Sequence, residues 1–368
     1  MIYADNAATT KLAPEVFEEM KEYLLESYGN PSQPYNFSRK VKRAIQEARN
    51  TIADCIGADF EEILFTSCGT ESDNWAVNCG MGGHGSIITS SIEHHAILES
   101  CKAAEKSGRT VKFMPVDGLG LIDLSWLKDN ISDTDSLVSV MYANNEIGTI
   151  QPIDEIASIA HRYGCLFHTD AVQAVGHITI NVHKSKIDLL SASAHKFNGP
   201  KGVGFLYAKR GLSIDPYING GGQEFGMRAG TENVASIVGM AKALDTNCKE
   251  MEHNKKHLLS LEKELLKGLR QAGIDFMRNG SDHHIPGNVS LSFNGIDGEM
   301  LLHRLDLMGI CVSTGSACDS QRTQLSHVLR AIDIPEEYAF GTIRISLGKY
   351  NTFEDVITIV KAIKKILG

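Results

Sequence analysis

Short apolar runs alternate with amphipathic helical patterns along the first two thirds of the chain. The runs are EILFT, SIITS, SLVSVMY, CLFHTD, DLLSAS and GVGFLYAK, at residues 62–66, 86–90, 136–142, 165–170, 188–193 and 202–209. Helical spacing of apolar residues covers 14–27, 37–56 and 153–164. Strands that are apolar on both faces and separated by helices favour a mainly parallel sheet covered on both sides. We therefore predict an α/β fold.

The pattern changes after about residue 248. A long charged helix is predicted over 254–273, and further short strands follow it. A chain of 368 residues is too long for one small core. We predict a large α/β domain over residues 14–248 and a smaller domain made of residues 1–13 and 249–368.

Composition and charge exclude several classes of function. Hydrophobic residues make up 42% and charged residues 22% of the chain, as in ordinary globular proteins. The formal net charge of -9 argues against nonspecific binding to nucleic acid or to anionic membranes. No apolar run approaches the roughly 20 residues of a membrane span. The first ten residues lack a basic region followed by an apolar stretch, so we expect no secretory signal.

The eight cysteines are irregularly spaced and include no CxxC pair. This spacing predicts neither a disulfide framework nor a zinc or other metal site. We expect reduced thiols in a cytoplasmic protein.

Polar groups follow several of the predicted strands, where sheets of this kind place their ligands. The segment FTSCGTESDN, with Gly69 and Thr70, could offer backbone N–H groups to an anion, although such residues are usually just a helix N-cap. The pair His94–His95 is more often a surface or packing feature than a pair of ligands. Asp170, with Gln173 three residues on, could face the same site, or Asp170 could simply cap the next helix.

Lys196 lies in SASAHKFNGPKG, after an apolar run that offers almost no group to neutralise an ammonium ion. Ser193 and His195 stand beside it. Desolvation lowers the pKa of an amine and makes it nucleophilic. Pyridoxal phosphate chemistry needs such a lysine, an acid for the pyridine nitrogen, an aromatic ring to stack and donors for a phosphate. The strand ends supply all four.

The chain resembles the cysteine desulfurases of the NifS/IscS type, within the fold-type I, class V aminotransferase group. The matching segments run in family order from YADNAATT to IRISLG and cover nearly the whole chain. They include TSCGTESDN, EHHAIL, NNEIGTIQPI, HTDAVQAVG, SAHKFNGPKGVG, GGGQEFGMRAGT and STGSAC. The resemblance implies a seven-stranded, mainly parallel sheet in the large domain and an α+β small domain that carries the STGSAC loop.

The resemblance also implies a role for each candidate residue around pyridoxal phosphate. Lys196 would form the Schiff base, Asp170 would hold the pyridine nitrogen, and His94 would stack on the ring and assist proton transfer. Gln173 would bond the phenolic oxygen. The phosphate would be held by Gly69, Thr70, Ser193 and His195, and by Thr231 of a second subunit, which implies a homodimer with shared sites. Asn145 and Arg344 would bind the substrate carboxylate.

Cys318 would attack the sulfur atom of L-cysteine, which leaves L-alanine and a persulfide for a sulfur-acceptor protein. On composition alone, Cys318 would be one of eight ordinary cysteines. The small residues of its loop, together with the resemblance, instead favour a catalytic cysteine. Cys68 is the other cysteine of interest. The acceptor stays open among an iron–sulfur scaffold, a thiolation system and a selenium pathway.

The chain departs from the common family pattern at Phe225, Gln33, Tyr35, Ser38 and Asp319, which leaves the details of the substrate pocket open. Two alternative functions remain. One is a class V enzyme of other chemistry, either a transaminase or a selenocysteine lyase. The other is a non-catalytic sulfur-binding or regulatory partner.

Overall fold

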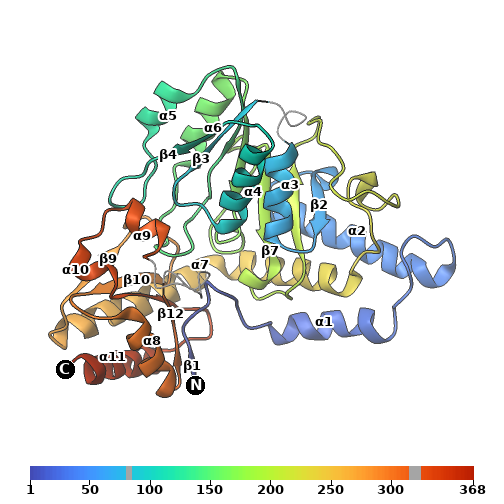
Figure 1. The fold of residues 1–368 in the computed structure, drawn as a ribbon. Coiled ribbons are helices and arrows are strands. Elements are labelled where there is room, and N and C mark those ends of the chain that lie inside the picture. Colours follow the sequence, from blue (N-terminus) through green and yellow to red (C-terminus); the bar gives the residue numbers. More distant parts are fainter. Residues whose placement is uncertain (80–84, 315–324) are drawn as a thin grey trace.

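A central seven-stranded sheet organises the computed structural model, which describes residues 1–368 except 80–84 and 315–324 (Figure 1). The strand order is β2-β8-β7-β6-β5-β3-β4. The strands are β2 (Ile63–Thr66), β3 (Ser86–Ser90), β4 (Val111–Met114), β5 (Asp135–Ser139), β6 (Leu166–Asp170), β7 (Leu189–Ser193) and β8 (Gly204–Ala208). Strand β8 runs antiparallel to both of its neighbours, β2 and β7, and the other pairings of this sheet are parallel. The predicted α/β fold with a mainly parallel seven-stranded sheet is confirmed.

Successive strand residues pack against helices on opposite faces of the sheet. On one face, Ile87 and Leu137 pack with α3 (Gly69–Cys79) and α4 (His95–Lys106). On the other face, their neighbours Ile88 and Val138 belong to the large core that includes α2 (Asn36–Ile56) and α6 (Ile153–Arg162). Side chains alternate across a strand, so these doubly buried strands are apolar throughout.

Helix α7 (Val234–Gln271) is 38 residues long and passes through both parts of the molecule (Figure 1). It begins 20 residues before the predicted start at residue 254. Its first half packs in the large core through Ile237, Met240 and Leu244, and its second half packs in a separate core through Leu258 and Leu265. The boundary at residue 248 therefore falls inside one continuous helix, and the division into two domains stays a prediction.

The second core is built on a four-stranded antiparallel sheet of order β12-β13-β10-β9. Its strands are β9 (Phe276–Asn279), β10 (Asn288–Phe293), β12 (Ser313–Thr314) and β13 (Thr342–Ser346). Two helices, α8 (Gly298–Leu307) and α11 (Phe353–Leu367), cover it. Strand β1 (Ile2–Tyr3) pairs in parallel with β11 (Ile310–Cys311), so the N-terminus joins this core.

The remaining helices are α1 (Pro14–Leu25), which packs along α7, α5 (Leu124–Asn130), α9 (His327–Ala331) and α10 (Glu336–Ala339). Within the described residues, no helix has the length and apolar character needed to cross a membrane.

Candidate active site

A cavity of about 610 Å³ opens beyond the carboxyl ends of the parallel strands, between the sheet and the second core. It is lined from the sheet side by His94, Asp170, Gln173, Ser193, His195 and Lys196, by Gly69 and Thr70 of α3, and by Asn145. From the second core, Ser313 and Arg344 reach the same cavity. All the predicted site residues except Thr231 and Cys318 therefore lie around one space.

Lys196 ends a short 3₁₀ turn (Ala194–Lys196) that directly follows β7. Its Nζ atom donates hydrogen bonds to the carbonyl oxygens of Ala7, at 2.6 Å, and Ala8, at 2.8 Å. These carbonyls come from the N-terminal segment and lie far from Lys196 in the sequence. These two bonds hold the amine at the cavity, on the same side as the buried Asp170 carboxylate, on which its charge acts.

Asp170 ends strand β6 and meets His94 inside the cavity. One side-chain atom each of Asp73, His94 and Asp170 lies within 4.8 Å of the others. Burial raises the pKa of Asp170, while the nearby His94 ring, the Val172 N–H and the charge of Lys196 oppose that rise. The Asp170 carboxylate therefore favours a positively charged group placed next to it.

His94 is the N-cap of α4, and its Nδ1 atom accepts a hydrogen bond from the backbone N–H of Ala96 at 3.1 Å. Burial lowers the pKa of His94, Asp170 raises it, and Lys196 and His95 lower it further. A neutral ring whose Nδ1 is an acceptor carries its proton on Nε2. His94 thus presents a proton-bearing nitrogen while its ring orientation is fixed by the helix.

Asp73 was missed by the sequence analysis. It lies in α3 and is 1% exposed, and its Oδ1 atom has no hydrogen-bond partner within the described residues. Burial and the nearby Asp170 raise its pKa well above the usual range. Asp73 lies in the segment TSCGTESDN, but nothing in that segment distinguishes it from a surface helix residue, because the packing of α3 against β6 and β7 brings it beside Asp170.

The N-terminus of α3 forms one end of the cavity. A Cβ atom on Gly69 would stand 2.7 Å from Cγ2 of Val172, so this close approach requires glycine. The backbone N–H groups and the dipole of an eleven-residue helix favour an anion here. Ser193 and His195 lie on the same side, and His195 Nδ1 is 3.1 Å from Oγ1 of Thr9. Burial lowers the pKa of His195 to about 4, so its ring is neutral at pH 7.

Arg344 lies in β13 and approaches the cavity from the second core. Its Nη2 atom donates to Oδ1 of Asp5 at 2.7 Å, and its Nη1 atom donates to the carbonyl oxygen of Asn145 at 2.8 Å. Its Nε atom is buried and has no hydrogen-bond partner within the described residues. The guanidinium group is therefore fixed in place, and its Nε–H group still lacks a hydrogen-bond acceptor among the described residues.

Two buried glutamates, Glu146 in the cavity wall and Glu93 next to His94, were also missed by the sequence analysis. Glu93 accepts hydrogen bonds from Ser90 Oγ at 2.6 Å and from the Met141 N–H at 2.9 Å, and burial raises its pKa to about 8. Burial raises the pKa of Glu146 to about 7, and this group accepts a bond from Ser326 Oγ at 2.6 Å. Each glutamate adjoins a candidate residue in a segment of the family resemblance: Glu93 precedes His94 in EHHAIL, and Glu146 follows Asn145 in NNEIGTIQPI.

Two predicted residues are not at the cavity of this chain. Thr231 lines a different surface pocket with Ser67, Glu224 and Arg228. Cys318 and Asp319 lie outside the described residues. The residues on either side of that gap, Thr314 and Leu325, both line the cavity.

The sequence departures at Phe225 and Tyr35 also lie away from the cavity lining. Phe225 is 54% exposed, and its ring centroid lies 5.0 Å from the guanidinium carbon of Arg49. Tyr35 is 51% exposed and precedes α2. Neither position changes the groups that surround Lys196.

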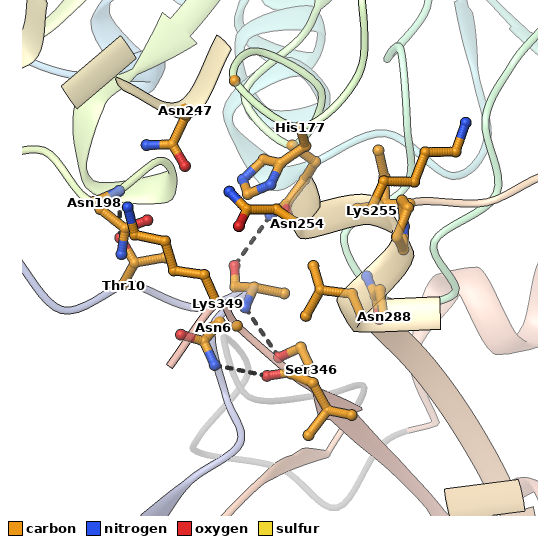
Figure 2. A pocket seen from close by; sticks show the side chains of 18 of the residues that line it. Asn6, Thr10, His177, Asn198, Asn247, Asn254, Lys255, Asn288, Ser346 and Lys349 are labelled. Carbon is orange, nitrogen blue, oxygen red and sulfur yellow. Dashed lines mark hydrogen bonds between the residues drawn. The ribbon is translucent and has the colours of Figure 1, made fainter. Parts of the chain in front are cut away.

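A second, smaller cavity of about 50 Å³ is lined by Asn247, Asn254 and Lys255 of α7 and by Asn6 of the N-terminal segment (Figure 2). Gln173 and Ala7 line both cavities. On its walls, Asn6 donates to the Ser346 carbonyl at 2.9 Å and Asn247 donates to the Phe197 carbonyl at 2.7 Å. The first bond ties the N-terminal segment to β13, and the second ties α7 to the residue that follows Lys196.

The aminotransferase class-V family model matches residues 2–359. The chain is 48% identical to the cysteine desulfurase IscS of Dictyoglomus turgidum over 373 aligned positions, which cover 100% of this chain and 94% of that protein. Among solved structures, a NifS-like protein has a TM-score of 0.94 and 40% identity, with coverage of 100% and 99%. The structure of SspA in complex with cysteine has a TM-score of 0.84 and 35% identity, with coverage of 96% and 100%.

Proposed function

This chain belongs to the class-V aminotransferase family and to its cysteine desulfurases, and from that premise we propose that it removes sulfur from L-cysteine with pyridoxal phosphate. One observation carries the proposal. A single cavity gathers Lys196, Asp170 and His94 beyond the carboxyl ends of β7, β6 and β3, with a helix N-terminus at one end and an arginine facing it.

The residues of the cavity fit pyridoxal phosphate. Lys196 offers a primary amine, buried Asp170 offers a carboxylate that favours a positive partner, and His94 offers a flat ring. The α3 N-terminus, with Thr70, Ser193 and His195, offers donors suited to a phosphate. When bound, this cofactor supplies an electron-accepting ring that stabilises negative charge on the carbon atom of its substrate.

The substrate's carboxylate would be held by Arg344. Planar guanidinium groups bind carboxylates through two parallel hydrogen bonds, which fix both position and orientation. Arg344 is already oriented by Asp5 and by the carbonyl oxygen of Asn145. A bound carboxylate would therefore meet a donor group that needs little reorganisation.

His94 and Lys196 would handle protons at the substrate. Neutral His94 presents its proton at Nε2, because Nδ1 is engaged by Ala96. Lys196, whose Nζ donates to the carbonyl oxygens of Ala7 and Ala8, would carry a proton to or from the substrate from the same cavity. Asp170, between them, would hold a positive ring nitrogen in its charged form.

Cys318 would take the sulfur atom. The bond between Cβ and Sγ of L-cysteine breaks, and a bond forms between that sulfur and the Cys318 thiol sulfur. The substrate carbon gains a proton and leaves as L-alanine, while Cys318 becomes a persulfide. Thiolates are the nucleophilic form, so the step needs a deprotonated Cys318.

Two further parts of the proposal concern other molecules. The persulfide sulfur would pass to an acceptor protein, as in the assembly of iron–sulfur clusters. Thr231 would reach the phosphate site of a second copy of this chain. Its position in a pocket next to Ser67, outside the cavity that holds Lys196, supports a role in a neighbouring subunit.

Incubation of the cofactor-loaded protein with L-cysteine tests the activity. Alanine and sulfide should appear in equal amounts when a reducing agent releases the persulfide. Cys318→Ala should bind the cofactor with its visible absorbance intact and form no alanine. Formation of pyruvate in place of alanine, or a requirement for an amino-group acceptor, would instead indicate a transaminase or another class-V chemistry.

A further inference from the structure

Two cysteines from helices α2 and α7 meet at the surface. Cys55 and Cys248 are both half-buried, and their thiols are in hydrogen-bonding contact. Both line a surface depression of about 390 Å³, together with Asp54, Asp245 and Lys249. None of these residues lines the cavity that holds Lys196, so the pair is separate from the candidate active site.

The two thiols are not equivalent. The hydrogen bond from Cys55 lowers the pKa of Cys248, against the opposing effects of burial and of Asp245. The same hydrogen bond, with burial, raises the pKa of Cys55. Cys248 is therefore the nucleophilic member, and Cys55 is the neutral thiol that stabilises its negative charge.

We propose that Cys55 and Cys248 form a dithiol site that reacts with low-molecular-weight disulfides and closes to a reversible disulfide between α2 and α7. The Cys248 thiolate attacks one sulfur of the reagent, forms a mixed disulfide and releases one thiol. Cys55 then loses its proton and attacks Cys248, which expels the second thiol. The protein pair loses two electrons and two protons, and the reagent is reduced to two thiols.

The charges around the depression select the reagent. Two carboxylates, Asp54 and Asp245, stand against one ammonium group, that of Lys249, which lies 2.7 Å from Asp245. An anionic disulfide meets net repulsion at this opening, whereas a cationic one is attracted. We therefore expect cystamine to react faster than oxidised glutathione.

The place of Cys248 in α7 gives the disulfide a structural consequence. Cys248 packs against the large core, as Cys55 does, and its neighbour Asn247 donates to the carbonyl oxygen of Phe197, the residue after Lys196. A bond to Cys55 closes a loop of more than half the chain. Such a cross-link restricts the unfolded chain strongly, so the oxidised protein should melt at a higher temperature.

Cystamine treatment of the cofactor-loaded protein, followed by alkylation and peptide mass spectrometry, tests the proposal. The untreated protein should show both cysteines alkylated. After treatment, a linked Cys55–Cys248 peptide should appear, without a cystamine adduct on either residue, and a reducing agent should reverse it. The melting temperature should rise with the fraction of linked peptide.

Single substitutions separate the two roles. Cys55→Ser should accumulate a stable cystamine adduct on Cys248, because no neighbouring thiol remains to displace it. Cys248→Ser should slow reaction at Cys55 by about tenfold or more, since the low-pKa thiol is gone. Cys311→Ser, at another half-buried cysteine, should behave like the unsubstituted protein. Separate adducts on both cysteines with no linked peptide would overturn the proposal, and equal rates with oxidised glutathione would overturn the charge preference.

Discussion

Replacing Arg49 with methionine should destabilise the protein strongly, because Arg49 balances a buried charge. Arg49 lies in α2 and forms two hydrogen bonds to the carboxylate of Glu224, at 2.8 and 2.7 Å. The side chains of this ion pair are only 5% and 3% exposed. The guanidinium carbon also lies 4.4 Å from the ring centroid of Phe65. Methionine keeps part of this packing but removes the charge.

The size of the effect follows from what remains around Glu224. After the substitution, its carboxylate keeps the hydrogen bond from the Phe65 N–H, at 2.8 Å, but loses both bonds to the guanidinium group. Breaking one side of a buried ion pair costs about 3–5 kcal/mol. Unfolding entropies scale with chain length, so this cost corresponds to a drop in melting temperature of roughly 4–7 °C for a chain of this size.

The conformation of the Glu224 turn adds to this expectation. Glu224 and Phe225 both have positive φ angles, of 46° and 58°, which is unfavourable for residues with a side chain. The ion pair holds this turn in place. Its release should also loosen the nearby Thr231 segment, and with it the binding of cofactor in a dimer.

Calorimetry and chemical denaturation of Arg49→Met measure the effect, with two comparisons. Arg43→Met on the same helix removes an exposed pair with Glu47, whose side chains are 79% and 68% exposed, and should change stability by less than about 0.5 kcal/mol. Combining Arg49→Met with Glu224→Leu removes both charges and should recover a large part of the loss. A melting temperature for Arg49→Met equal to that of Arg43→Met would refute the reasoning.

Three further predictions concern the cavity and its surroundings. Burial raises the pKa of Glu93 to about 8, so the native state holds a proton that the unfolded chain releases, and the free energy of unfolding should fall as pH rises from about 4.5 to about 8. In denaturation experiments Glu93→Gln should show a weaker fall over this range. Parallel curves of stability against pH for the two proteins would contradict this prediction. Arg344→Lys should raise KM for cysteine about tenfold or more with cofactor affinity unchanged, because lysine lacks the bidentate fork; an unchanged KM would remove Arg344 from substrate binding. Thr231→Val should weaken cofactor binding by the dimer about tenfold, as measured by absorbance titration, with the oligomeric state checked by sedimentation. If the unsubstituted protein sediments as a monomer and still binds the cofactor with full affinity, the shared site is refuted.

The sheet could be predicted from the sequence wherever its strands are buried on both faces. Strand β6 is buried apart from its first residue, and its apolar run ends at Asp170 as expected. Strand β4 was missed because it lies at the edge of the sheet and is only partly buried, with Lys112 in its middle. An edge strand has one face and one side open to solvent, so its sequence lacks the continuous apolar character of its neighbours.

The candidate site was predictable where it depends on strand ends. Lys196 and His94 follow apolar runs, and the rule that ligands bind beyond the carboxyl ends of parallel strands brings them together. Arg344 came only from the family resemblance, because it reaches the cavity from a separate core. Asp73 lies in the matching segment TSCGTESDN, but its place beside Asp170 could not be predicted, since a helix residue meets Asp170 only through tertiary packing.

The pairing of β1 with β11 constrains how this chain is made. Ile2 lies opposite Ile310, and Ala4 is fully buried among residues from the C-terminal third of the sequence. A ribosome delivers the N-terminus first, at about 5–20 residues per second. Strand β1 therefore stays unpaired for tens of seconds until β11 has been synthesised, while the strands of the central sheet can already pair with one another. The carbonyl oxygens of Ala7 and Ala8, which hold Lys196, belong to this N-terminal segment, so the lysine's surroundings are among the last parts of the protein to be completed during synthesis.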